Sequence, residues 1–250
     1  MALLHRMLTK SIISCAWIAV CSFRVCSALD FYFDAPNDWK LSDPKNSSPT
    51  VRVCFVNPKE GYTPSINLAV EKSALSLDEY IKLSQKPYQR NPLAKWRNLG
   101  SFTSAAGQGT LIEIDLTSKA GKGRILQFIV KKDDEFAVLT AAAGVDDLKN
   151  HLDLFKNAFR SLTVTDNLLD LIKDEKDQAS LKNLLVSLET ARNQVASDPS
   201  KDRSIPLTQE MKETISQIET ILSKYHDKGS CWHFLALRQC AHALEEKAKS

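Results

Sequence analysis

The periodicity of apolar residues changes once along this chain of 250 residues, near Asp166, and this change limits the possible folds more than any other feature. Before it, from about Phe31 to Thr165, short apolar runs and alternating patterns predict strands with two amphipathic helices among them. After it, apolar residues recur at intervals of three and four, as on the buried face of a helix. The sequence therefore predicts a mixed segment followed by a helical one.

Strands dominate the first segment. FYF at Phe31 begins one, and the runs VRVCFV and SINLAVEK predict two more. Four consecutive strands follow in WRNLGSFTSA, TLIEIDLTS, RILQFIVKK and EFAVLTAAA. In the second of these, Glu113 and Asp115 fall on one face, and Ile112 and Ile114 fall on the other. Because this alternation is typical of an antiparallel strand with one solvated face, we interpret the two carboxylates as surface residues rather than as a catalytic pair.

Two helices interrupt the strands. Ser76 precedes the run LDEYIKLSQ as an expected N-cap, and Pro87 and Pro92 are expected to end this helix. His151 lies in the second predicted helix, VDDLKNHLDLFKNAFRSL, where we expect an exposed or half-buried histidine rather than a ligand. The buried stripe of that helix is expected to comprise Leu148, Leu152, Phe155 and Phe159.

The segments FYFDAPNDW, VRVCFVNP, INLAVEKSALSLDEYIKLS and RILQFIVKKDDEFAVLTAAAGVDDLKNHLDLFKNAFRSL, in this order, resemble the PsbP/Mog-like superfamily over about residues 31–165. That group includes extrinsic lumenal subunits of photosystem II, a nuclear Ran-binding protein and many exported bacterial proteins and lipoproteins. The resemblance implies an α+β fold class, in which helices cover the faces of an antiparallel sheet in an α/β/α sandwich. It implies binding or assembly rather than catalysis and carries over no catalytic residue, since Phe33, Pro36 and Trp39 match as fold positions.

The remaining residues, 166–250, predict three helices with short links, which favours an antiparallel three-helix bundle. The first is expected to run from about Leu168 to Val195. Thr208 is the expected cap of the second, which should end at Gly229, and Ser230 is the expected cap of the third. The apolar seam of the second helix comprises Met211, Ile215, Ile218, Leu222 and Tyr225.

Two cysteines and two histidines fall within CWHFLALRQCAH, which we assign to the third helix. On one helix Cys231 and Cys240 lie about 13 Å apart along the axis, too far for a disulfide. His233 and Cys240 share one face, whereas Cys231 and His242 share a roughly opposite one, so the four side chains cannot bind one metal ion. We therefore expect this helix to pack through a stripe formed by Phe234, Leu237, Ala241 and Leu244.

Other roles for these side chains stay open. Residues 29–250 contain three cysteines, and an odd number leaves a free thiol or a link to another chain in an oxidising compartment. Cys54 lies in an apolar strand and is expected to be buried and inert, whereas Cys231 at a helix N-terminus would have the most reactive thiolate. Cys231 or Cys240 could bond to another segment or chain, and His226 could join a metal ion shared between helices.

Residues 1–28 have the order of a signal peptide. Arg6 and Lys10 precede 13 mostly apolar residues, and Cys26-Ser27-Ala28 would place small residues before a cut at Leu29. The apolar run is shorter than the roughly 20 residues of a spanning helix. An uncleaved anchor and a lipoprotein acylated on Cys15 or Cys26 remain the alternatives. The expected organisation is a signal peptide at 1–28, a sandwich domain at 29–165 and a helical bundle at 166–250.

The charge balance excludes one class of function. Three of the 33 basic residues and none of the 30 acidic ones lie in the first 28 residues, so residues 29–250 are formally neutral. Nucleic-acid binding usually needs a clustered basic surface, and no such cluster stands out.

The sequence favours an exported, non-enzymatic envelope protein that binds a protein or a small molecule. No catalytic, cofactor-binding or metal-binding residue is assigned, and no cofactor is expected. Peripheral membrane association is compatible with the sequence, and the oligomeric state stays open. The alternatives are a lipid-anchored structural envelope protein, and a hydrolase or redox enzyme that would use Cys231 with the histidines at 226, 233 and 242.

Overall fold

The computed structural model describes residues 29–42, 48–58, 63–118, 121–196 and 208–247, and at 118, 192–196 and 241–247 it describes the backbone alone. The expected signal peptide at 1–28 lies outside the described residues. The main sheet consists of β2 (Lys40–Leu41), β3 (Val51–Val56), β4 (Ser65–Lys72), β5 (Ala94–Ser104), β6 (Gly107–Ser118), β7 (Gly121–Lys132) and β8 (Glu135–Gly144). Their order is β2-β3-β4-β8-β7-β6-β5, and all neighbours are antiparallel. The four consecutive strands predicted after Pro92 are confirmed as β5 to β8.

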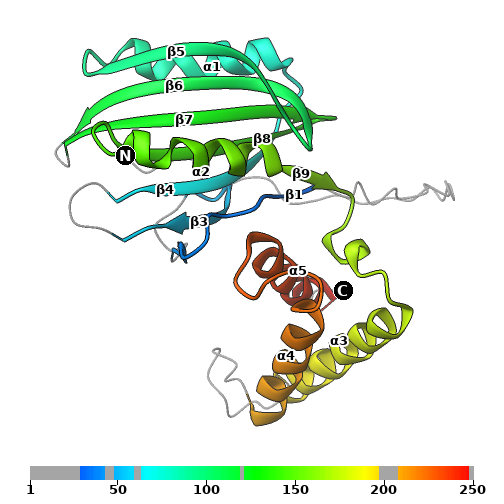
Figure 1. Ribbon diagram of the computed structural model, residues 1–250. Coiled ribbons are helices and arrows are strands. Elements are labelled where there is room, and N and C mark those ends of the chain that lie inside the picture. Colours follow the sequence, from blue (N-terminus) through cyan, green and yellow to red (C-terminus); the bar gives the residue numbers. More distant parts are fainter. Residues whose placement is uncertain (1–28, 43–47, 59–62, 119–120, 197–207, 248–250) are drawn as a thin grey trace, which may run out of the picture.

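Two helices, α1 (Leu77–Gln89) and α2 (Leu148–Ser161), cover opposite faces of this sheet (Figure 1). The alternation along β8 separates the two sides. Phe136 and Val138 share one buried cluster with Ile81 of α1, whereas Leu139 belongs to a second cluster with Phe155 of α2. The architecture is therefore an α+β sandwich built on an antiparallel sheet, as predicted.

The start of α1 agrees with the sequence, but its end does not. The Ser76 hydroxyl accepts from the Glu79 backbone N–H, and the Glu79 carboxylate accepts from the Ser76 backbone N–H, which completes a capping box. Pro87 was expected to end the helix, yet α1 continues through it to Gln89. A proline in the last turn removes one backbone donor without breaking the preceding turns, and Pro92 lies beyond the end.

A short strand that precedes the main sheet in the sequence pairs with a short strand that follows α2. β1 (Asp30–Tyr32) pairs antiparallel with β9 (Thr163–Thr165), so that Asp30 lies opposite Thr165. This pairing holds the beginning of the described chain beside the exit from α2. Phe31 and Phe33 then enter the same buried cluster as Phe155.

The expected helix from Leu168 to Val195 is wrong at its start. Leu168 begins a short 3₁₀ turn, η2 (Leu168–Leu171), and α3 (Glu175–Ala196) begins only after a break. Side-chain capping explains the break, because the Asp174 carboxylate accepts from the backbone N–H groups of Lys176 and Asp177. The apolar residues at 168–172 belong to η2 and to its exit, and Leu168 and Ile172 are buried there.

Two further helices, α4 (Gln209–Leu222) and α5 (Cys231–Lys247), follow α3. The Thr208 hydroxyl accepts from the Met211 N–H and the Ser230 hydroxyl from the His233 N–H, so both predicted caps are present. The predicted end of α4 at Gly229 is wrong, because the helix stops at Leu222 and a turn containing Gly229 leads into α5.

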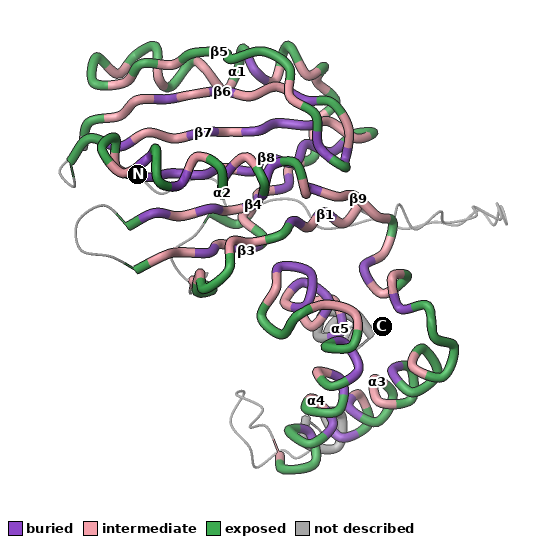
Figure 2. Tube along the Cα trace, viewed as in Figure 1, coloured by how far each residue is buried: buried purple, intermediate pink, exposed green. Residues whose placement is uncertain are grey.

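The helices α3, α4 and α5 contact one another, and α5 lies beside β1 and β3 (Figure 1). The expected packing stripe of α5 is confirmed in part, because Phe234 and Leu237 pack against the buried cluster. Phe234 and Leu237 are only partly buried, and the side chains of Ala241 and Leu244 lie outside the described ones. The buried side of α5 is purple in Figure 2, and its members are Cys231, Trp232, His233, Leu235, Ala236 and Cys240. This wider face is needed because α5 is packed by the sheet segment, η2 and both other helices.

Candidate functional site

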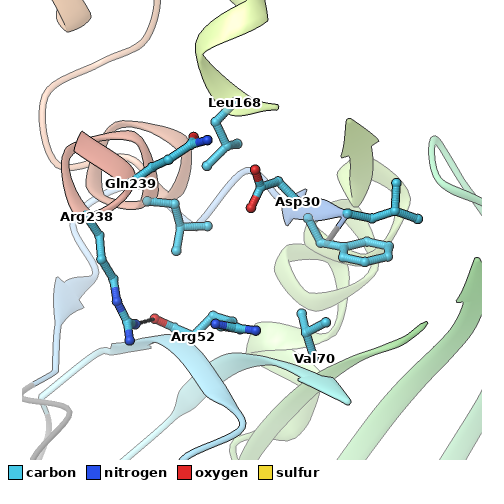
Figure 3. Close-up of a pocket in the computed structure, with 9 residues that line it drawn as sticks. Asp30, Arg52, Val70, Leu168, Arg238 and Gln239 are labelled. Carbon is cyan, nitrogen blue, oxygen red and sulfur yellow. Dashed lines mark hydrogen bonds between the residues drawn. The ribbon is translucent and has the colours of Figure 1, made fainter. Parts of the chain in front are cut away.

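A pocket lies where the sandwich meets the C-terminal helices. Its cavity of about 170 Å³ is bounded by β1, β3, β4, η2 and α5. In Figure 3, Asp30 lies across the cavity from Arg238 and Gln239 of α5, with Arg52 and Val70 below them in this view. The lining residues are Leu29, Asp30, Phe31, Arg52, Val70, Leu168, Leu235, Arg238 and Gln239. We call this the junction pocket.

Three hydrogen bonds fix the walls of the junction pocket. The buried Trp232 side chain of α5 donates its indole N–H to the Leu168 carbonyl at 3.2 Å, which ties α5 to η2. Arg238 donates from Nη1 to the backbone carbonyl of Arg52 at 3.1 Å, which ties α5 to β3 (Figure 3). Gln239 donates from Nε2 to Asn167 Oδ1 at 2.9 Å. The polar groups of the pocket are therefore held by helix, strand and turn together.

The pocket carries charges of both signs. Burial raises the pKa of the Asp30 carboxyl above its ordinary value, while a backbone hydrogen bond at Leu168 and the Arg52 charge oppose that shift. The lining contains two arginines, Arg52 and Arg238, and one carboxyl group, that of Asp30, so it has a net positive charge when Asp30 is ionised. Gln239 Oε1 is buried and accepts no hydrogen bond within the described part of the chain. The site thus offers cationic donors and one unused acceptor beside an apolar wall.

Two other hollows are less suited to a specific ligand. One of about 490 Å³ follows η2 and α3, and its lining includes the exposed side chain of Val186. Another, of about 340 Å³, lies between the loop at 34–39 and the turn at 226–230, and it is mainly polar. Neither brings a pair of arginines against an apolar wall, as the junction pocket does.

The observed burial of the cysteines differs from several predictions made from the sequence. Cys231 is fully buried, and its burial raises the pKa of its thiol to about 12, so the reactive thiolate expected at this helix N-terminus is wrong. Cys240 is also buried, with its pKa raised to about 11 by that burial. Cys54 is only half-buried, whereas a buried position was expected. Within the described residues all three thiols are free, so neither Cys231 nor Cys240 is bonded to another described segment.

The described side chains of His226 and His233 do not form a common site. His226 packs its ring against Trp232 and Tyr32, with centroids 4.8 and 5.9 Å away. His233 is buried, and its Nε2 lies 3.4 Å from the Ser223 hydroxyl. The side chain of His242 lies outside the described ones. Among the residues that the structure describes, no three His, Cys, Asp or Glu side chains are placed to share a metal ion.

His151 is buried, whereas an exposed or half-buried position was expected. Its Nε2 lies 2.8 Å from Asp147 Oδ2, and its ring contacts Trp39 and Phe155. The aspartate at the start of α2 thus holds the ring of a residue one turn later. This contact anchors the loop that carries Trp39 on α2.

The carboxylates Glu113 and Asp115 are paired with arginines on the neighbouring strands. Arg97 of β5 contacts both carboxylates, and Arg124 of β7 lies 3.3 Å from Glu113 and 2.5 Å from Asp115. These arginines lower the pKa of Asp115 below its ordinary value, Arg124 most strongly. The group is an ion-pair network on a partly exposed sheet face, in agreement with the interpretation as surface residues.

Four residues of the junction pocket, Asp30, Arg52, Arg238 and Gln239, were missed by sequence reasoning. Arg52 and Arg238 are 186 positions apart in the sequence. No local pattern links a strand arginine to a helix arginine at such a distance. Only the return of α5 onto β3 brings them together.

No protein-family model and no curated protein sequence matches this chain. Among solved structures it is similar to LpqN of Mycobacterium tuberculosis, described as involved in cell envelope biogenesis, with 13% identity, a TM-score of 0.45, and coverage of 57% of this chain and 87% of that one. It is similar to the cyanobacterial PsbP of Synechocystis, with 14% identity, a TM-score of 0.39, and coverage of 59% and 99%. It is also similar to the Ran-binding protein Mog1p of Saccharomyces cerevisiae, with 12% identity, a TM-score of 0.39, and coverage of 53% and 88%. A PsbP and a Mog1p are therefore both among the solved structures to which this chain is similar.

Proposed function

We propose that this is an exported binding protein without enzymatic activity, and that it holds a small organic anion in the junction pocket. The observation that carries the proposal is the meeting of Arg52 and Arg238 with an apolar wall in one partly open cavity. Binding sites are typically concave and apolar, with a few polar groups that orient the ligand. The junction pocket has this composition.

The size of the cavity sets the size of the ligand. A cavity of about 150 Å³ lined by apolar side chains can hold benzene, and the junction pocket measures about 170 Å³. The guanidinium groups favour a carboxylate or phosphate head, because arginine donors match the geometry of these anions. Phe31, Val70 and Leu235 would cover the apolar body of the ligand. A ligand of this class resembles a benzoate ion in size and charge.

Export and the C-terminal helices complete the proposal. The pattern of residues 1–28 supports passage to the cell envelope with cleavage after Ala28. We propose that α3, α4 and α5 act as a three-helix bundle that supplies one wall of the junction pocket. An envelope protein that docks on this bundle would then respond to whether the pocket is filled. None of the described helices is long and apolar enough to cross a membrane.

The test is a calorimetric titration of the purified protein with benzoate, with benzamide as the uncharged ligand of the same shape. We expect benzoate to bind more tightly than benzamide. Arg52→Gln and Arg238→Gln should each weaken benzoate binding about tenfold or more, the value of a hydrogen bond to a charged group. Arg90→Gln is the matched control, because Arg90 is exposed at the end of α1.

Equal binding of benzoate and benzamide, or equal loss in all three variants, would contradict an anion site. Arg238→Lys keeps the charge and separates loss of charge from loss of the contact with the Arg52 carbonyl. If neither ligand produces heat that saturates, the junction pocket is not a site for anions of this size.

A further inference from the structure

Glu135, at the start of β8, has a carboxylate that is buried and incompletely paired. Its side chain is 2% exposed, and its Oε2 accepts a hydrogen bond of 2.9 Å from the backbone nitrogen of Leu29. Within the described part of the chain, this nitrogen is the one hydrogen-bond donor to the carboxylate. Lys72 Nζ lies 3.7 Å from Oε1, beyond hydrogen-bond length, and its side chain is 53% exposed. An ionised carboxylate is costly to bury unless a charge and hydrogen bonds compensate it.

The surroundings of Glu135 do not supply that compensation fully. Asp30 lies close enough for the Glu135 charge to raise its pKa, so two carboxyl groups share this region. The cations near them are Arg52 of β3, Lys72 of β4 and Lys132, which is the ladder partner of Glu135 on β7. The Leu29 nitrogen lies closer to the Glu135 carboxylate than the Lys72 ammonium group does. That nitrogen is fixed in place because β1 begins at the next residue and pairs with β9.

Leu29 is also the residue expected to follow the signal-peptide cut. We infer that hydrolysis of the Ala28–Leu29 peptide bond creates an α-ammonium group that pairs with the buried Glu135 carboxylate. In this step a signal-peptidase-type enzyme adds water across the bond, so that Ala28 leaves as a carboxylate and Leu29 keeps the nitrogen. At neutral pH this nitrogen becomes an ammonium with three donors and a positive charge.

The consequence is that removal of the leader completes the fold. Before the cut, the Leu29 amide offers the Glu135 carboxylate one hydrogen bond from an uncharged donor. After the cut, the donor also carries a positive charge, so the hydrogen bond becomes an ion pair between opposite charges. The new cation also lies beside Asp30 on the rim of the junction pocket, which Leu29 helps to line. Processing therefore adds a positive charge at the edge of the proposed ligand site.

The pairing has a defined pH dependence. The carboxylate of Glu135 should raise the pKa of the Leu29 α-amino group above its ordinary value of about 8. Because the folded value lies above the unfolded one, the stabilisation is complete below about pH 8 and is lost as the pH rises through the folded pKa. Lys72, Lys132 and Arg52 would lower the amine pKa, and Asp30 would raise it further.

The experiment begins with the full chain expressed in a secreting host. Intact mass and N-terminal sequencing should identify Leu29 as the first residue. The α-amine is then labelled by reductive methylation with [¹³C]formaldehyde, and its pKa is read from the NMR shift against pH. Glu135→Gln should lower the amine pKa by about one unit, which equals a tenfold change in its protonation constant. Glu71→Gln is the matched control, since Glu71 bonds to Tyr80 on the opposite face of the sheet.

Each outcome decides the inference. A first residue other than Leu29 overturns it, and so does an amine whose pKa is ordinary in the wild-type protein. A raised value that Glu135→Gln leaves unchanged also overturns it. If Glu135→Gln fails to fold, the wild-type titration alone still decides. The measurement needs no ligand, so a failure of benzoate binding would leave this inference intact, and its own failure would leave the binding proposal intact.

Discussion

Asp30 is the residue whose ionisation the junction pocket affects most clearly. Its pKa is raised, chiefly because burial disfavours the charged carboxylate. A group whose folded pKa is raised contributes stability at low pH, and that contribution is lost as the pH rises through the folded pKa. The ionised Asp30 carboxylate therefore lowers the stability of the folded protein at neutral pH. We attribute this cost to a role of the Asp30 charge in the junction pocket.

Asp30→Asn tests this assignment. Asparagine keeps an acceptor for the backbone hydrogen bond at Leu168 but carries no charge at any pH. We expect the variant to gain stability relative to the wild type as the pH is raised from about 4 to 7, because only the wild type ionises. Urea midpoints of both proteins at the two pH values measure the effect. A relative gain that is larger at pH 4 than at pH 7 would contradict it.

The thiols predict an order of reactivity. Cys54 is half-buried, whereas burial raises the pKa of Cys231 to about 12 and that of Cys240 to about 11. At pH 8 an aromatic disulfide reagent should modify Cys54 first and leave the other two unmodified until the protein unfolds. Peptide mapping by mass spectrometry identifies the modified residue. Rapid modification of Cys231 in the folded protein would contradict this order. It would show that the Cys231 thiol is reactive despite its burial.

Among the elements, η2 and α5 decide whether the junction pocket exists. The Trp232 indole is 1% exposed and donates to the Leu168 carbonyl, so it joins the turn that follows β9 to the first turn of α5. The sequence indicated the caps of α5 and its helical character. It did not indicate η2, because Leu168 and Leu171 match the helical period equally well.

Trp232→Phe should cost about 1–3 kcal/mol in the free energy of unfolding, because it leaves a buried carbonyl without its donor. Trp96→Phe is a matched control with the same loss of ring size, since the Trp96 indole N–H is buried without a partner among the described residues. That variant should lose clearly less stability. Chemical denaturation followed by circular dichroism compares the two, and equal losses would show that the Leu168 hydrogen bond contributes nothing.

Local patterns predicted most of the elements and little of the site. Alternation along β5 to β8 and the capping box of α1 are properties of neighbouring residues, and both were found as expected. The break before α3 was missed because Asp174 acts through its side chain within an otherwise helical pattern. The junction pocket depends on the pairing of β1 with β9 and on the return of α5 to β3, and no local pattern encodes either contact.

In the whole molecule, one buried cluster crosses the expected boundary between residues 165 and 166. It includes Phe155 of the sandwich, Leu168 of η2, Leu222 of α4 and Trp232 of α5. Figure 2 shows the buried side of α5 on the same side as β1 and β3. Two segments that share a core are expected to unfold together, because neither can expose its part of the core without cost.

We therefore predict a single unfolding transition for the processed protein. Tryptophan fluorescence, which includes Trp232 at the junction, and far-ultraviolet circular dichroism should give coincident urea curves. A helical segment that melted first would produce two transitions and would separate the pocket walls before the sandwich unfolds. Such a result would contradict a shared core.

The claim that a small organic anion binds between Arg52 and Arg238 is tested most directly by the Nε–Hε signals of the arginines in ¹⁵N NMR spectra. Arg97 and Arg124 serve as internal controls, because both are already paired with Glu113 and Asp115. On addition of benzoate, we predict that the signals of Arg52 and Arg238 shift together and saturate, while those of Arg97 and Arg124 stay in place. Shifts of all four arginines, or of none, would contradict a specific anion site at the junction of sheet and helices.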